Sequence, residues 1–88
     1  MPRTIEKNGR VFVEEYLVVD TTEKIIYAWY YTRCLATYAI KTQYPDCVVM
    51  RGVFERYANG DCSRYAVGRT IGEARANLEK GIFEYETL

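Results

Sequence analysis

The fold of this 88-residue chain is decided by residues 21–43, which read TTEKIIYAWYYTRCLATYAIKTQ. Apolar residues recur in this stretch at steps of three and four, the spacing of one face of an amphipathic helix. Asp20 and Glu23 have the spacing of a helix capping box. Tyr44-Pro45 predicts the end of the helix, because the residue before a proline avoids the α region. The expected core stripe of this helix over residues 21–43 is Ile25, Ala28, Trp29, Thr32, Leu35, Ala36, Ala39 and Ile40.

A strand is the alternative for the first part of this segment. Residues 25–32 are rich in β-branched and aromatic side chains, which suit a strand paired with residues 10–19. A strand there predicts a sheet with more strands and a single C-terminal helix. On such a strand Tyr27, Trp29 and Tyr31 share one face, and the argument for the aromatic interface described below is weaker.

Two Asn-Gly dipeptides, at residues 8–9 and 59–60, predict β-hairpins because Asn-Gly supplies the positive φ angles of a type I′ turn. The second expected strand does not alternate cleanly, and a bulge at Glu14-Glu15 would return its apolar side chains to one face. We expect these two carboxylates to lie in solvent. The expected strands are Arg3–Lys7, Arg10–Val19, Val48–Tyr57 and Ser63–Arg69.

A second helix is predicted from Thr70, because Thr70 and Glu73 repeat the capping spacing. The elements together predict one α+β domain over residues 1–88, in the order ββαββα. In this fold a four-stranded, mainly antiparallel sheet carries both helices on one face. The expected apolar stripe of the second helix is Ile71, Ala74, Leu78, Ile82 and Tyr85, with Arg75, Glu79 and Lys80 facing away.

The composition argues against several classes of site. Lys+Arg and Asp+Glu number 12 each and His is absent, so there is no net positive field for nucleic acid and no usual acid–base or zinc-binding side chain. Cys34, Cys47 and Cys62 form no CxxC pair and are interpreted as reduced, structural thiols. No signal core and no stretch of about 18 uncharged residues occurs. We expect a cytoplasmic chain that is not an enzyme and has no metal, no cofactor and no membrane partner.

Aromatic residues make up 15% of the chain and nine of them are Tyr, which combines a large apolar ring with a hydrogen-bonding hydroxyl. A helix that is apolar on both sides in so small a domain exposes one side to another chain, or its rings lie over the sheet edge with their hydroxyls in water. On a helix over residues 21–43, the face opposite the core stripe carries Tyr27, Tyr30, Tyr31, Cys34 and Tyr38.

A basic and aromatic mixture on the second hairpin is the other candidate surface. Arg and Tyr are enriched at protein-interface hot spots, and they also stack on bases and hold phosphates. Residues 45–88 contain six basic and seven acidic side chains, and this balance argues against strong phosphate binding. The mixture consists of Arg51, Arg56, Arg64 and Arg69 with Tyr57 and Tyr65.

Residues 67–78, Val-Gly-Arg-Thr-Ile-Gly-Glu-Ala-Arg-Ala-Asn-Leu, resemble the strand-to-helix junction of HicB-type antitoxin domains, where Gly-x-Thr is followed by Glu-Ala and a helix. The resemblance implies a capped helix docked on a hairpin and an antitoxin-like role. The chain departs from that family in lacking a DNA-binding tail after this helix and in its long aromatic segment. In type, and not in residues, it is also similar to small phage-encoded inhibitors such as anti-CRISPR proteins.

These observations predict a non-enzymatic protein, a small inhibitor of the phage-encoded type, that binds another protein or a second copy of itself. It would act by occluding the working surface of its partner. The alternative is an antitoxin-like or nucleic-acid-associated module that uses the second hairpin, with an affinity that falls steeply with salt. The expected binding residues are Tyr27, Tyr30, Tyr31, Tyr38, Arg51, Arg56, Arg64 and Tyr65.

Overall fold

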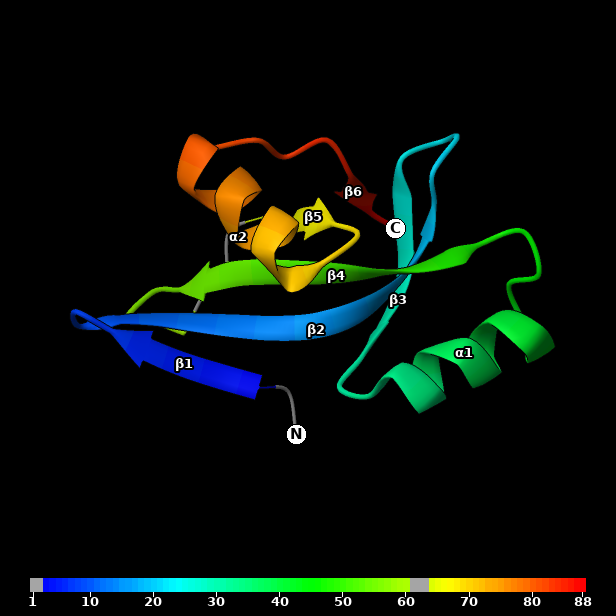
Figure 1. Cartoon of the computed structure of the whole chain (residues 1–88), viewed down its shortest axis with the longest axis horizontal. Coiled ribbons are helices and arrows are strands. Elements are labelled where there is room, and N and C mark those ends of the chain that lie inside the picture. Colours follow the sequence, from blue (N-terminus) through cyan, green and yellow to red (C-terminus); the bar gives the residue numbers. More distant parts are fainter. Residues whose placement is uncertain (1–2, 61–63) are drawn as a thin grey trace.

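The computed structural model describes residues 3–60 and 64–88, which form six strands and two helices (Figure 1). The α+β class predicted from the sequence is confirmed. The order ββαββα and the four-stranded antiparallel sheet are wrong, because the sheet also contains β3 and β6. The elements are β1 (Arg3–Lys7), β2 (Arg10–Asp20), β3 (Ile25–Tyr30), α1 (Arg33–Thr42), β4 (Val48–Arg56), β5 (Ala66–Gly68), α2 (Ile71–Lys80) and β6 (Glu86–Thr87).

The long strand β2 organises the sheet, whose strand order is β5-β4-β2-β3-β6, with β1 also paired to β2. β4 runs antiparallel along one edge of β2, from Val11 to Val19. On the other edge β1 pairs with the first half of β2 and β3 pairs with the second half, both antiparallel. β6 lies parallel on the outer edge of β3. The sheet twists along β2, so that β3 stands across the direction of β1 (Figure 1).

The predicted helix over residues 21–43 is wrong in its first half, where β3 pairs with β2. The carboxylate of Asp20 does accept the expected hydrogen bonds, from the N–H of Thr22 (2.9 Å) and of Glu23 (3.1 Å). These bonds close the turn between β2 and β3, because an Asp that accepts from nearby amides starts turns as readily as helices. The alternative of a strand is confirmed for Ile25–Tyr30.

The second half of the segment is helical, so the single-helix form of that alternative is also wrong. α1 begins after Thr32, whose Oγ1 accepts from the N–H of Leu35 (3.2 Å), and it ends at Thr42, shortly before Pro45. Ala36 and Ala39 of α1 are buried and face the sheet. A run of residues with helical spacing thus contains one strand and one shorter helix.

The two Asn-Gly dipeptides form different turns. Asn8 (φ 53°) and Gly9 (φ 76°) both have positive φ, as expected for the predicted type I′ turn between β1 and β2. In the second dipeptide only Gly60 has a positive φ (86°), and its N–H donates to the carbonyl of Tyr57 (2.9 Å). A type I′ turn at Asn59 is therefore wrong, because that turn needs positive φ at both central residues.

The second hairpin pairs β4 with a strand shorter than the predicted 63–69. β5 covers only Ala66–Gly68, with Gly68 opposite Arg51. Ser63 and Cys62 lie outside the described residues.

The predicted bulge at Glu14-Glu15 is wrong. The pairing of β2 with β4 is continuous through both residues. A register shift occurs instead between Val18 and Val19 in the pairing with β3, where Tyr27 is the additional residue. β2 does not need a bulge because both of its faces are covered.

Both helices cover the face of the sheet that carries the even-numbered residues of β2. Val18 packs against Ala36 and Ala39 of α1. Glu14 accepts hydrogen bonds from Arg75 of α2. The two helices therefore cover opposite halves of β2 on this face and lie apart from each other, α2 by β4 and β5 and α1 beyond the end of β3 (Figure 1).

The C-terminal segment covers the other face. Leu17, Val19 and Ile26 form a buried cluster there, and Tyr85 packs into it. Tyr85 was expected on the second helix, but it reaches this face because α2 ends before it. Ile82, also expected in that helical stripe, is exposed.

α2 begins at the predicted cap, where Thr70 Oγ1 accepts from the N–H of Glu73 (3.2 Å). It ends at Lys80, because Gly81 adopts a left-handed φ of 71° and its N–H donates back to the carbonyl of Leu78 (3.1 Å). Gly81 is therefore the C-cap of α2.

Candidate functional site

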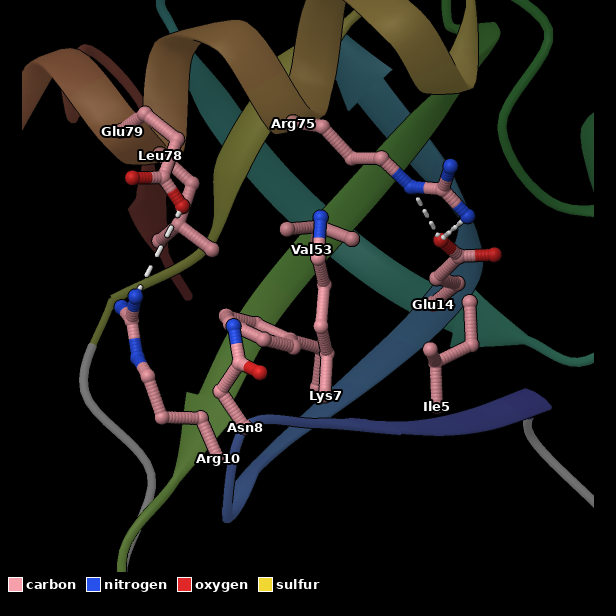
Figure 2. Close-up of a pocket in the computed structure, with 10 residues that line it drawn as sticks. Ile5, Lys7, Asn8, Arg10, Glu14, Val53, Arg75, Leu78 and Glu79 are labelled. Carbon is pink, nitrogen blue, oxygen red and sulfur yellow. Dashed lines mark hydrogen bonds and ion pairs between the residues drawn. The ribbon is translucent and has the colours of Figure 1, made fainter.

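A groove with a volume of about 420 Å³ lies between the β1–β2 hairpin and α2 (Figure 2). Its size suits a small ligand. The charged side chains that line it determine which chemistry it could perform. Arg75 and Glu79, one helical turn apart, both reach from α2 towards the hairpin. None of the binding residues expected from the sequence lines this groove. Its lining is Ile5, Phe12, Val53 and Leu78 on the apolar side and Lys7, Asn8, Arg10, Glu14, Arg75 and Glu79 on the polar side.

One end of the groove is closed by an ion pair between Arg75 and Glu14 (Figure 2). Glu14 is 2% exposed, and its Oε2 accepts from Arg75 Nε (2.7 Å) and also from Nη2. Glu14 Oε1 is buried without a hydrogen bond in the part of the chain that the structure describes, and Arg3 Nε lies 3.7 Å from it. The expectations that Glu14 is solvated and that Arg75 faces away are wrong, because a buried carboxylate needs a cation beside it.

The other end of the groove holds a second set of paired charges. Arg10 Nη2 donates to Glu55 Oε1 (2.6 Å), and Arg10 Nη1 lies 3.9 Å from Glu79 Oε1. The hydrogen bond from Arg10 is the main cause of a lowered pKa at Glu55. Ion pairs thus engage the charged groups at both ends of the groove. This arrangement holds α2 against the hairpin.

The Arg10–Glu55 pair should make a pH-dependent contribution to folding. Because the folded pKa of Glu55 is lowered, its contribution is complete above the unfolded pKa and is lost as the pH falls through the folded pKa. An NMR titration of the Glu55 carboxylate should therefore show a higher pKa in an Arg10→Met variant than in the wild type. Identical titration curves would show that Arg10 does not hold this carboxylate in solution.

The structure divides the tyrosines that were expected on one helix face. Tyr27 and Tyr30 lie on β3 and are partly buried. The ring of Tyr27 lies 5.6 Å from that of Tyr44, between centroids, and Tyr30 packs into the cluster under α1. Tyr31, after β3, and Tyr38, on α1, are exposed. Only two of the four are therefore available to a partner, because a strand and a helix replace the single helix.

Residues 29–38 carry several exposed large apolar side chains. Trp29 is 51% exposed and Tyr38 is 67% exposed. Trp29 and Leu35 were expected in the core stripe, and this expectation is wrong because Trp29 belongs to a strand and Leu35 is exposed on α1, where Ala36 and Ala39 are the buried residues. Alternation along β3 was the signal that could have placed Trp29 on the face opposite Ala28 and Tyr30. We call the exposed side chains of this segment, Trp29, Tyr31, Leu35 and Tyr38, the β3–α1 surface; within it, Trp29 lies on the face of the sheet opposite α1.

The basic and aromatic residues of the second hairpin are not brought together. Arg51 Cζ lies 4.0 Å from the ring centroid of Tyr16, and Arg33 Cζ lies 5.4 Å from the same ring. Tyr65 lies on the other face of the sheet, where its hydroxyl donates to Glu15 Oε1 (2.5 Å). Glu15 is therefore buried and hydrogen-bonded, and not solvated as expected.

The remaining arginines of this set, Arg56, Arg64 and Arg69, are exposed. Arg51 is instead committed to the sheet, since its Nε also reaches the carbonyl of Glu15 (3.5 Å). The geometry therefore offers no single Arg and Tyr surface. The cation–π contacts around Tyr16 were not apparent from the sequence, because Arg33 and Arg51 come from different elements.

Two of the three thiols lie in the part of the chain that the structure describes. Cys34 is exposed on α1 and Cys47 is partly buried after it. Burial is the main cause of a raised pKa at Cys47, and the nearby Asp20 and Asp46 raise it further. A raised pKa lowers the thiolate fraction that acts as the nucleophile. Across residues 3–60 and 64–88, no three His, Cys, Asp or Glu side chains are placed to hold a metal ion.

Neither of the two described helices is long and apolar enough to cross a membrane. Comparison with known protein families, with curated proteins and with solved structures finds no match to this chain.

Proposed function

We propose that this chain is a non-enzymatic, cytoplasmic protein-binding domain whose binding surface is the β3–α1 surface. The observation that carries the proposal is that exposed large apolar side chains are concentrated in one short stretch of the chain, residues 29–38. Four such side chains lie between Trp29 and Tyr38, and the other four are spread over the rest of the described residues. Apolar side chains gathered in this way commonly mark a site of protein contact.

The chemistry of the surface supports a protein partner. Trp and Tyr are the residues most enriched at interface hot spots, because they bury large areas at a low cost in side-chain entropy. Leu35 and Tyr38 are three residues apart on α1 and therefore neighbours on one face of that helix. Between Ile25 and Thr32 the sequence has no charged residue, so a partner can cover this segment without burying an unpaired charge. A protein that covers its partner in this way would act by occlusion.

The proposal is tested by capture from a lysate of the native host, followed by cross-linking mass spectrometry. The test variant is Trp29/Tyr31/Tyr38→Ala, and the matched control is Tyr57→Ala, since Tyr57 is as exposed as Trp29 but lies after β4. We expect the wild type and the control to retain one dominant protein cross-linked to the β3–α1 surface. The triple variant should lose it by about tenfold or more.

Circular dichroism first establishes that all three proteins are folded. Equal recovery of the same protein by all three would contradict the proposal. Recovery of nucleic acid, with an affinity that falls steeply with salt, would move the binding surface to Arg56 and Arg64 of the second hairpin.

A further inference from the structure

The outer edge of β3 is paired over only part of its length. β6 lies on it opposite Ile25 and Ile26, with the N–H of Glu86 donating to the carbonyl of Lys24 and the N–H of Leu88 to that of Ile26, both at 3.0 Å. Beyond this point, no strand within residues 3–60 and 64–88 pairs with the outer edge at residues 28–30. This edge already accepts one strand, and it continues past the end of that strand.

Proteins usually protect such edges with charged residues or prolines. The outer edge of β1 is protected in this way, because it carries Arg3, Glu6 and Lys7. Residues 25–32 of the β3 segment contain no charged residue, no proline and no glycine. The bulge at Tyr27 interrupts the ladder where β6 ends, but residues 28–30 after it keep a regular register with β2.

We propose that a second copy of this chain pairs with the outer edge of β3. The two β3 strands would run antiparallel over residues 28–30, related by a two-fold axis at Trp29. The inference rests on the proposed function, because it assigns a partner to part of the same surface. Strand addition to an exposed sheet edge is a common mode of protein recognition.

A second copy fits this edge because the edge is complementary to itself. In an antiparallel pair centred on Trp29, each Ala28 lies opposite the Tyr30 of the other copy, and Trp29 lies opposite its own counterpart. On the two-fold axis a charged residue at position 29 would oppose an identical charge, and residues 28–30 carry no charge. Ala28 is small and allows close approach of the backbones. The ladder is short, so the Trp29 pair would be the main anchor of the contact.

Trp29 is the only tryptophan, so its fluorescence reports directly on this contact. The experiment is sedimentation velocity of the purified full chain over a series of concentrations, with tryptophan emission recorded on the same samples. We expect the mass to rise from the 10.3 kDa of the monomer to twice that value. The emission should shift to shorter wavelength with the same midpoint, because pairing removes the indole from water.

A Trp29→Lys variant places a charge on each side of the two-fold axis and should remain monomeric at every concentration. Tyr57→Lys is the matched control, since Tyr57 has the same 51% exposure as Trp29, and it should dimerise as the wild type does. Hydrogen exchange of the wild-type amides at residues 28–30 gives a readout without any substitution. Some of these amides should exchange more slowly as the concentration rises.

A wild type that stays at 10.3 kDa throughout overturns the inference. A dimer that persists in folded Trp29→Lys, or that forms without slower exchange at residues 28–30, overturns it as well. The proposed function is tested separately from this inference. If a monomeric chain still captures a foreign protein through the β3–α1 surface, only the assignment of a second copy as partner is wrong.

Discussion

Replacing Gly68 by alanine is expected to lower the free energy of unfolding by about 3 kcal/mol, because α2 lies directly against this position. A Cβ built on Gly68 lies 2.5 Å from the backbone nitrogen of Ala74 and 2.7 Å from the Cβ of Glu73. Real Cβ atoms do not approach other atoms so closely, and the atoms concerned belong to the first turn of a capped helix. The methyl group would therefore push α2 away from β5 and open the contact that buries Ala74.

Gly72→Ala is the matched control for this substitution. Gly72 lies in α2 itself, and a Cβ there meets nothing closer than Thr70 Oγ1 at 3.8 Å. Alanine at this position should stabilise the protein by about 0.5 kcal/mol, because it is the better helix former. Urea denaturation of both variants tests the pair. A neutral Gly68→Ala would show that α2 is free to move away from β5.

The second large effect is expected at Arg75, whose replacement by methionine should destabilise the fold by about 3 kcal/mol. Arg75 donates two hydrogen bonds to Glu14, whose side chain is 1% exposed. Removal of the guanidinium leaves a buried carboxylate with only Arg3 nearby, at 3.7 Å. Half of the Arg75 side chain is exposed, so water can partly replace it, and the loss should lie at the low end for a buried ion pair.

Two further variants establish whether the buried charge is the cause. Arg3→Met should have a small effect, because Arg3 is 74% exposed and makes only the longer contact. Glu14→Leu in the Arg75→Met background should recover most of the lost stability, since it removes the unpaired carboxylate. Urea denaturation of the wild type, Arg75→Met, Glu14→Leu and the double variant gives the coupling energy between Arg75 and Glu14. A double variant as unstable as Arg75→Met alone would show that lost packing of Arg75 accounts for the effect.

Local features of the sequence predicted the elements that local chemistry controls. Asn8 and Gly9 turn the first hairpin, and Thr70 caps α2, because the required φ angles and hydrogen bonds lie within a few residues. A local pattern also gave a wrong prediction where a turn and the start of a helix share the same hydrogen bonds. Asp20 makes the same hydrogen bonds in the turn before β3 as it would at the start of a helix.

The candidate site was only partly predictable. Tyr31 and Tyr38 are exposed as expected, whereas Tyr27 and Tyr30 are partly buried. Trp29 was assigned to the core because its helical spacing matched Leu35 and Ile40, and the strand instead turns its side chain to the face opposite α1. Spacing alone therefore identified the segment but not the side chains that it exposes.

The sequence by itself determined the α+β class, the first hairpin and the capped helix α2, since each depends on residues close together in the chain. Only the tertiary structure decided that Ile25–Tyr30 forms a strand and that Glu14 is buried. The strand exists because β2 offers it a free edge, and Glu14 is held by Arg75, 61 residues away. Strand pairing and charge burial depend on partners that are distant in sequence, and no short pattern specifies which partners meet.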